Sequence, residues 1–361
     1  MAYVILSVLL IWIIVKLNTR RLIEAKIRLE GIVKERTAEI SHQKEEIQTQ
    51  ADNLQDANEE INAKNADLNQ KNEQITSSVR YASKIQNAVL PFNERISQQL
   101  NYFILFRPKD IVSGDFYWFV HLQEKEGYSA KTFIAAVDCT GHGVPGAFMS
   151  MIGTQQLNKI VNADKVTSPA EILRLLDIDI RRALKQEQTQ RRDGMDVCLC
   201  KIEKQEDKKT KITFSGAKRP LYILLNPGVE NNANNQENEK RIKEFNKNKK
   251  CRIHNTALSP IVEIRGDRKS IGGAETKSKS EFSNQEILLS EGDFIFLTSD
   301  GYVDQNNPER KHLGAKKFIE ILSKNSTKSL PEQKQILETE LDKWQGDEEQ
   351  RDDITIIGVK I

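Results

Sequence analysis

The sequence predicts an α+β domain that follows a long helical segment. The N-terminal part is an apolar run followed by a seven-residue repeat without glycine or proline. The remainder contains about ten short apolar runs bounded by turn residues, with helical stretches grouped between them. Strands that come in groups, with helices gathered between the groups, are typical of an α+β fold.

Residues 1–17 are expected to form a transmembrane helix. The segment Ala2–Val15 is uninterrupted apolar sequence, and basic residues such as Lys16 and Arg20 follow it. A spanning helix needs about 20 residues, so its start is expected to be incomplete. A signal peptide is the alternative, but no basic region precedes the run and no small-residue cleavage site follows it. The positive-inside rule then predicts a single-pass protein of the cytoplasmic membrane, with everything after the helix in the cytoplasm.

A repeat of aliphatic residues predicts a coiled coil over residues 18–90. If the aliphatic residues occupy the d positions, asparagines fall on a positions, which favours parallel two-stranded pairing at a cost in stability. A single solvated helix is the alternative, because polar a positions weaken the seam. We expect a parallel homodimer whose weak seam can shift register and pass a signal. The aliphatic residues are Val33, Ile40, Ile47, Leu54, Ile61, Leu68 and Ile75, and the asparagines are Asn58, Asn65 and Asn72.

Residues 91–361 are expected to form the globular domain. Helices are predicted over 145–162, 169–186, 313–323 and 331–344. The second opens with Ser168-Pro169-Ala170-Glu171, the pattern of a capping box. Residues 226–256 are rich in Asn, Glu and Lys and are interpreted as a flexible insertion loop. The predicted strands are YFILFRP, GDFYWFV, TFIAAVD, VCLCKIE, KITFSGA, LYILL, IVEIR, EILL, DFIFLTSD and ITIIGVKI.

Composition restricts the function classes. The formal net charge is +2, so charge does not indicate a nucleic acid partner and we expect none. The cysteines lack the paired spacing of a zinc site or of a secreted disulfide framework, which fits a reducing cytosol. Cys198 and Cys200 lie two apart on a predicted strand, so core packing is their default interpretation.

Acidic residues stand where predicted strands begin or end. Single acids of this kind are usually turn formers, but several together suggest convergence, and like charges cannot share a site without a cation. An all-oxygen set favours Mg²⁺ or Mn²⁺ over zinc. Two such ions can activate a water and clamp a phosphoryl oxygen, which predicts hydrolysis of a phosphate ester. The acids are Asp115, Asp138, Asp300, Asp352 and Asp353.

The turn after Asp138 has the composition of a ligand-binding turn. An apolar run ends on Val137, and Gly141, Gly143 and Gly146 follow before helical spacing begins. Glycines allow another group to approach the backbone closely. A plain strand-to-helix turn with a capping aspartate is the alternative.

An ordered set of motifs resembles the metal-dependent protein serine/threonine phosphatases (PPM family), specifically their bacterial SpoIIE-like branch. The resemblance covers roughly residues 100–361, and the motifs occur in family order. It implies a four-layer αββα sandwich of two antiparallel sheets flanked by helices, with a centre of two Mg²⁺ or Mn²⁺ ions at one end. The motifs are GDFYW, VDCTGHGVPGAFMS, GMDVCL, FSGAKRPLYIL, GDFIFLTSDGYVDQ and RDDITII.

The resemblance also assigns the metal ligands. The bridging aspartate of the family falls on Asp138, which is also expected to act in catalysis, and the carbonyl of Cys139 lies beside it. The set is completed by Asp115, Asp300 and Asp352, with Asp353 as the alternative to Asp352.

Further positions are assigned more loosely. His142 matches a histidine that eukaryotic relatives are proposed to use as general acid, with helix packing as an equal alternative. Asp193 and Asp196 lie near a third, weaker metal position of relatives. The phosphate-binding arginine of eukaryotic members has no clear counterpart. Arg107 is the nearest candidate, and a structural salt bridge is the other interpretation.

The resemblance implies a Mg²⁺/Mn²⁺-dependent protein serine/threonine phosphatase of bacterial signal transduction. Its substrate would be phosphoserine or phosphothreonine on a regulatory protein of the anti-sigma-factor antagonist type. The alternative is an inactive phosphatase-like module that binds phosphoproteins in a membrane signalling complex. A histidine kinase would share the layout, with His42 as phosphoacceptor, but the sequence lacks the asparagine and glycine-rich boxes of an ATP-binding domain.

Overall fold

The computed structural model describes residues 1–123, 129–189, 192–205, 207–226, 232–256, 258–273 and 281–361. The chain forms two units, Met1–Thr76 and Ser77–Ile361. The first unit consists of most of one long helix, and the second contains the sheets and the remaining helices.

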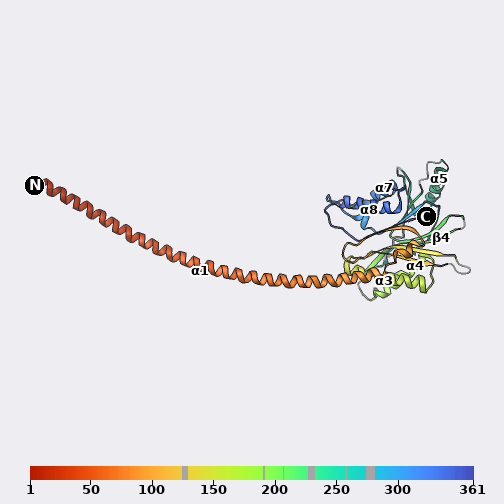
Figure 1. Ribbon diagram of the computed structural model, residues 1–361, viewed down its shortest axis with the longest axis horizontal. Coiled ribbons are helices and arrows are strands. Elements are labelled where there is room, and N and C mark those ends of the chain that lie inside the picture. Colours follow the sequence, from red (N-terminus) through yellow and green to blue (C-terminus); the bar gives the residue numbers. More distant parts are fainter. Residues whose placement is uncertain (124–128, 190–191, 206, 227–231, 257, 274–280) are drawn as a thin grey trace. The chain divides into compact units, whose positions relative to one another are not determined.

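Helix α1 (Ala2–Val89) includes both the apolar N-terminal run and the seven-residue repeat (Figure 1). By length and composition alone, its apolar start suffices to cross a membrane. The aliphatic residues of the repeat are all exposed on this helix, and Gln86 is its one buried residue among those described. Insertion into a membrane and pairing with a second copy stay predictions.

Two antiparallel sheets form the centre of the second unit, as the sequence predicted. Every pair of named strands in the described residues is antiparallel. The first sheet has the order β1 (Asn101–Arg107), β12 (Ile354–Lys360), β11 (Phe294–Thr298), β6 (Leu221–Leu224), β8 (Ile261–Ile264) and β7 (Cys251–His254). The second has the order β10 (Gln285–Leu289), β5 (Thr210–Ala217), β4 (Gly194–Lys204), β3 (Lys131–Cys139) and β2 (Phe116–Leu122), with β9 (Ile271–Gly272) paired to β4.

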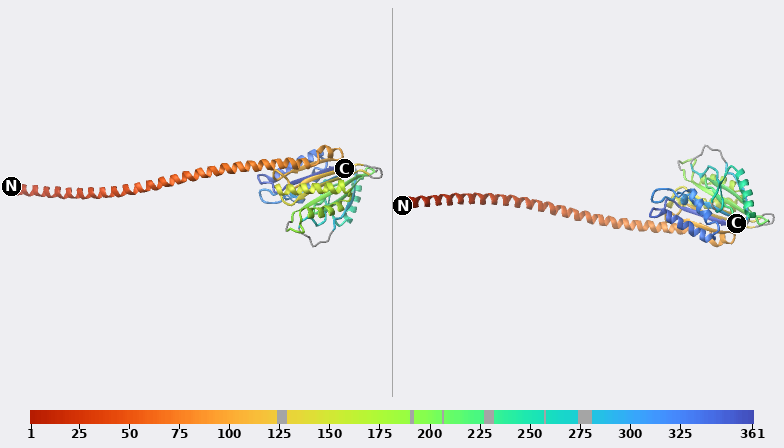
Figure 2. Two further views of the ribbon diagram at one scale, coloured as in Figure 1. Left: turned by 90° about the horizontal axis from the view of Figure 1, so that it is seen from below. Right: turned by 90° about the horizontal axis from the view of Figure 1, so that it is seen from above.

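Apolar residues fill the space between the two sheets. They also cover the outer face of each sheet. Residues of both sheets, among them Ile134, Phe214 and Ile357, form one buried cluster. Helices cover the outer faces, and Figures 1 and 2 show α3 and α4 apart from α7 and α8. The helices of this unit are α2 (Asn93–Ser97), α3 (Gly143–Asn158) with the π-turn η1 (Lys159–Ala163), α4 (Pro169–Ala183), α5 (Asn232–Lys247), α6 (Gly301–Asp304), α7 (Gly314–Lys324) and α8 (Leu330–Gln345).

Strand β3 shows why its sequence is an unbroken apolar run. Phe133, Ala135 and Val137 pack toward the helices α3 and α4, whereas Ile134 and Ala136 pack between the sheets. Because both faces of the strand are buried, the usual alternation of apolar and polar residues is absent. The strand then delivers Asp138 at its end.

The interpretation of residues 226–256 as a loop is wrong for much of the segment. Residues 232–247 form α5, and residues 251–254 form the edge strand β7. Ile242 and Phe245 of the helix pack against the cluster between the sheets. Two apolar positions three residues apart suffice to anchor a helix, although the surrounding polar composition conceals them. The part at 227–231 lies outside the described residues.

The capping box predicted at the start of α4 is also wrong. Ser168 is the N-cap residue, but its side chain makes no capping hydrogen bond. Glu171 instead accepts two hydrogen bonds from Arg174, each 2.7 Å long. Asn284 from a distant part of the chain accepts the hydrogen bond from the Ala170 N–H at 2.8 Å. A tertiary contact therefore replaces the local one.

Candidate metal centre

Aspartates from remote parts of the sequence meet at one end of the two sheets. Asp115 directly precedes β2, and the pairing of Phe116 with Val137 places it beside Asp138 near the end of β3. Asp300 follows β11, and Asp352 precedes β12, which pairs with β11. The strand register thus gathers the acids that the sequence analysis singled out.

Glycines allow the segments that carry Asp115 and Asp138 to approach closely. A Cβ atom on Gly114 would lie 2.4 Å from the carbonyl oxygen of Gly141, and one on Gly146 would lie 2.3 Å from the same oxygen. Gly141 itself has a φ of +86°, which favours glycine. Side chains at these positions would push the two aspartates apart.

Asp115 is the most deeply buried of these acids. Its residue is 3% exposed, and its Oδ2 atom is buried without a hydrogen-bond partner. Burial, and next the charge of Asp138, raise the pKa of the Asp115 carboxyl well above its usual value. A buried carboxylate oxygen without a partner is costly, and a bound cation would satisfy it.

Asp138 experiences the same crowding. Burial raises the pKa of its carboxyl well above the usual value, and the neighbouring charge of Asp300 raises it further. Asp196 also contributes, because it faces Asp138 directly across the β3–β4 ladder. The site therefore concentrates negative charge that a cation would relieve.

Arg219 supplies one positive charge within this cluster, and the sequence analysis missed it. Its guanidinium nitrogens lie 3.1 Å from Asp300, 3.3 Å from Asp196 and 3.7 Å from Asp138. The side chain is 17% exposed, and its Nε atom is buried without a partner. The sequence offered one indication of Arg219: it is a basic residue in the turn between two apolar strands, inside the motif FSGAKRPLYIL.

The two adjacent acids before β12 have different surroundings. Asp353 is 2% exposed, and its two carboxylate oxygens accept hydrogen bonds from the backbone N–H groups of Lys109 (2.8 Å) and Gly114 (2.7 Å). Asp352 accepts one from the N–H of Asp353 at 2.8 Å, and burial, then the charge of Asp300, raise the pKa of its carboxyl. Asp352 therefore belongs to the acidic cluster, whereas Asp353 fastens the segment that leads to Asp115.

Known proteins share the sequence pattern and the fold of this domain. Residues 267–361 match the family model for stage II sporulation protein E (SpoIIE). The chain is similar to the SiaA-PP2C domain of Pseudomonas aeruginosa, with 29% identity and a TM-score of 0.60, over 80% of this chain and 98% of that one. It is also similar to a Bacillus subtilis structure of the PP2C phosphatase domain of SpoIIE with a fragment of its regulatory domain, with 17% identity and a TM-score of 0.49, over 73% and 64% of the two chains. No curated protein matches.

This chain carries a domain that resembles the PP2C-type phosphatases, and its residues 267–361 match their SpoIIE branch. The resemblance inferred from the ordered motifs is thereby confirmed.

Within the SpoIIE-like domain, His142 lies at the edge of the acidic cluster. It precedes α3, and its side chain is 48% exposed, so it does not serve helix packing. Its Nδ1 atom lies 2.7 Å from Oδ2 of Asp110, and its Nε2 atom lies 3.1 Å from Nζ of Lys109. Hydrogen bonds on both ring nitrogens hold the imidazole in one orientation.

The contacts of the more loosely assigned residues are as follows. Arg107 forms a salt bridge with Asp342 at 2.6 Å, so the structural interpretation fits it better than phosphate binding. Asp196 accepts a 2.6 Å hydrogen bond from Ser270 and pairs with Arg219. For Asp193, the described contacts involve its backbone carbonyl, which accepts hydrogen bonds from Gly273 and Gln186.

The donor set of the SpoIIE-like domain fits divalent cations that prefer oxygen. Within the described residues, no group of three or more His, Cys, Asp or Glu side chains has the geometry of a preformed metal site. The crowded carboxylates and the unpartnered oxygen of Asp115 nevertheless provide the ligands that Mg²⁺ and Mn²⁺ favour. The Cys139 thiol is buried, and burial raises its pKa well above the usual value, so only the carbonyl of this residue suits such an ion.

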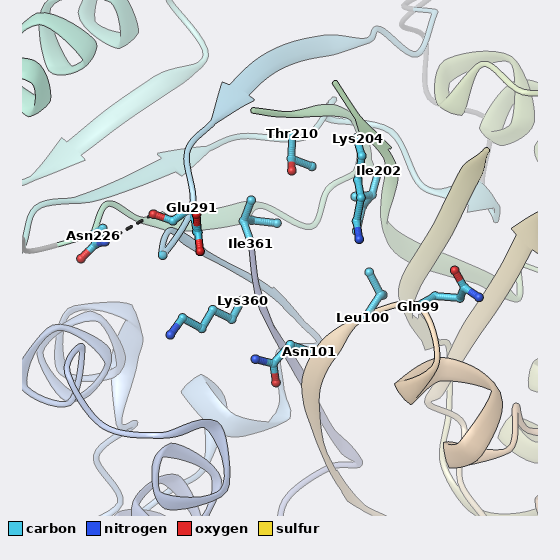
Figure 3. A pocket seen from close by; sticks show the side chains of 11 residues that line it. Gln99, Leu100, Asn101, Ile202, Lys204, Thr210, Asn226, Glu291, Lys360 and Ile361 are labelled. Carbon is cyan, nitrogen blue, oxygen red and sulfur yellow. Dashed lines mark hydrogen bonds between the residues drawn. The ribbon is translucent and has the colours of Figure 1, made fainter. Parts of the chain in front are cut away.

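A cavity of about 700 Å³ lies elsewhere (Figure 3). Its lining includes Asn101 at the start of β1, Lys204 at the end of β4 and Lys360 at the end of β12. These are the strand ends opposite to those that carry the aspartates. The cavity contains none of the clustered acids.

Proposed function

We propose that the SpoIIE-like domain is a Mg²⁺- or Mn²⁺-dependent protein serine/threonine phosphatase. The observation that carries this proposal is the unpartnered, buried Oδ2 atom of Asp115 beside Asp138. The residues that would hold two divalent ions are Asp115, Asp138, Asp300, Asp352 and the carbonyl of Cys139.

The ions, when bound, would supply an activated water and positive charge for the phosphoryl oxygens. Arg219 would help to bind the substrate phosphate, because its planar guanidinium suits the paired oxygens of a phosphoryl group. Its Nε–H is buried without a hydrogen-bond partner, which fixes less of the side chain than the ion pairs of its terminal nitrogens do. The terminal N–H groups of Arg219 now face Asp138 and Asp300, and bound cations would compete with Arg219 for these carboxylates.

His142 is the proposed proton donor to the departing serine or threonine oxygen. The carboxylate of Asp110 lies 2.7 Å from its Nδ1 atom and would orient the ring for proton transfer. Lys109 lies on the other side of the ring, with its Nζ atom 3.1 Å from Nε2. For His142 to donate a proton from Nε2, Lys109 would have to turn away from this nitrogen.

The N-terminal segments would place and regulate this activity. We propose a transmembrane helix over residues 1–17, a parallel coiled-coil homodimer over 18–90 and the phosphatase domain over 91–361, facing the cytoplasm. The substrate would be phosphoserine or phosphothreonine on a regulatory protein of the anti-sigma-factor antagonist type. The support for this substrate class is the sequence resemblance. No contact within the described residues identifies the substrate.

Hydrolysis of p-nitrophenyl phosphate and of a phosphoserine peptide by the full chain tests the proposal. We expect Mn²⁺-stimulated hydrolysis that is lost in Asp300→Asn and absent in EDTA. An inactive phosphoprotein-binding module would bind the peptide without hydrolysing it at any Mn²⁺ concentration. That result would overturn the assignment as an enzyme.

A further inference from the structure

A groove of about 340 Å³ lies beside the acidic cluster. It is formed by the turn between β5 and β6 and by the segment that follows β8. The residues that line it are Lys218, Pro220, Glu263, Arg265, Gly266, Asp267 and Arg268.

The groove carries unbalanced positive charge. Asp267 pairs with Lys250, and Glu263 is hydrogen-bonded to His254 at 2.7 Å. In the described part of the chain, Arg265 and Arg268 are exposed and have no carboxylate within ion-pair distance. The formal net charge of the whole chain is only +2, so the positive charge of this groove does not reflect a generally basic chain.

The groove is joined rigidly to Arg219. Lys218 lies next to Arg219 in the chain, and its Nζ atom is 3.6 Å from Asp196. The N–H of Lys218 donates to the carbonyl of Asp267 at 2.8 Å, which ties the turn to the segment after β8. A Cβ on Gly266 would lie 2.7 Å from the carbonyl oxygen of Arg219, so the two segments are packed backbone to backbone.

We propose that this groove binds acidic residues that flank the phosphorylated serine or threonine of the protein substrate. The inference rests on the proposed function, since it takes the phosphoryl group to lie at Arg219 and the aspartates. A peptide whose phosphate reaches Arg219 would extend past Lys218 toward Arg265 and Arg268. Carboxylates on that peptide would meet complementary charge, whereas lysines would meet repulsion.

The test uses the full chain, a charge-reversal variant and a matched control. Arg265→Glu combined with Arg268→Glu reverses the charge of two groove residues and leaves the proposed catalytic residues unchanged. Lys208→Glu combined with Lys209→Glu makes the same change in net charge at the exposed β4–β5 turn, which lies at the opposite strand ends. The probes are two fluorescein-labelled phosphoserine peptides, one with glutamates and one with lysines around the phosphoserine, and p-nitrophenyl phosphate.

Peptide binding, followed by fluorescence anisotropy, is the first readout. We expect the wild-type chain to prefer the glutamate peptide, and the groove variant to bind it about tenfold more weakly, with a smaller dependence on salt. The control variant should bind like the wild type. Equal affinity for both peptides, or equal losses in the two variants, would overturn the proposal.

Hydrolysis is the second readout and separates the two proposals. The groove variant should lose kcat/KM on the glutamate peptide about tenfold but keep wild-type rates on p-nitrophenyl phosphate, which has no flanking residues. A wild-type chain that binds the glutamate peptide selectively but hydrolyses neither substrate would support the groove and contradict the phosphatase. A chain that hydrolyses the phosphopeptides and p-nitrophenyl phosphate but binds the two peptides equally would support the phosphatase and contradict the groove.

Discussion

Gln86 and Ser113 are joined by a pair of hydrogen bonds. The Gln86 side-chain nitrogen donates to the carbonyl oxygen of Ser113 at 2.6 Å, and its side-chain oxygen accepts from the N–H of Ser113 at 3.1 Å. The same nitrogen donates to the hydroxyl of Ser150 on α3 at 2.8 Å. Ser113 lies two residues before Asp115, and α3 follows the turn after Asp138. The last turns of α1 are therefore bonded to both segments that position the acids.

Replacing Gln86 with alanine should loosen the Asp115 segment. The buried N–H and carbonyl of Ser113 would lose their partner, so we expect the free energy of unfolding to fall by about 1–3 kcal/mol and hydrolysis of p-nitrophenyl phosphate to slow. Urea denaturation and initial rates measure both effects. Asn87→Ala, at the exposed neighbouring position, is the control. A Gln86→Ala chain as stable and as active as the control would show that Gln86 does not hold the Asp115 segment in place.

The coiled-coil seam offers a second test. Asn58, Asn65 and Asn72 occupy one column of the repeat, and Gln86 falls in the same column fourteen residues after Asn72. Changing the three asparagines to valine should strengthen a parallel dimer, because polar a positions cost stability. If the seam biases the site through Gln86, the phosphatase rate should change as well. Light scattering and rate measurements check this, and an unaltered rate in a tighter dimer would contradict regulation through the seam.

Asp352 and Asp353 should respond differently to substitution by asparagine. Asp352→Asn should abolish Mn²⁺-stimulated hydrolysis while leaving the stability of the metal-free chain unchanged or higher, because it removes a charge from a crowded cluster. Asp353→Asn should lower the free energy of unfolding by about 1–3 kcal/mol, since one of two buried N–H groups loses its acceptor. Chemical denaturation without metal gives the comparison. The reverse pattern would make Asp353 the ligand.

Arg219→Gln should make stability depend strongly on divalent ions. Without Arg219, three carboxylates lose their shared positive partner, so the metal-free chain should be less stable by about 1–3 kcal/mol. Saturating Mn²⁺ should restore most of this loss because the ions neutralise the same groups. Thermal unfolding with and without Mn²⁺ measures the difference. A loss of equal size in both conditions would mean that Arg219 acts only in packing.

The sequence was most informative where structure is local or chemistry is distinctive. All ten predicted strands are present, and the aspartates at their ends lie at one end of the two sheets. Arg219 and Gln86 were missed because their roles depend on partners that are remote in sequence. Glutamine in a coil and arginine in a turn have no distinctive pattern of their own.

The errors share the same origin. The short strands β7 and β9, of four and two residues, carry too few apolar positions to be recognised by periodicity. Helix α5 depends on Ile242, Phe245 and the buried pair between Arg241 and Asp293. At the start of α4, Asn284 replaced the expected local cap. In each case a tertiary contact outweighed the local composition.

Calorimetric titration of Mn²⁺ into the metal-free chain measures directly whether the clustered aspartates bind metal ions. We expect binding of a pair of ions in the wild type, and lost or greatly weakened binding in Asp138→Asn, which lacks a carboxylate of the proposed ligand set. We also expect hydrolysis of p-nitrophenyl phosphate to rise with the same Mn²⁺ dependence as binding. Mn²⁺ binding that is absent in the wild type, or unchanged in Asp138→Asn, would contradict the proposed metal centre.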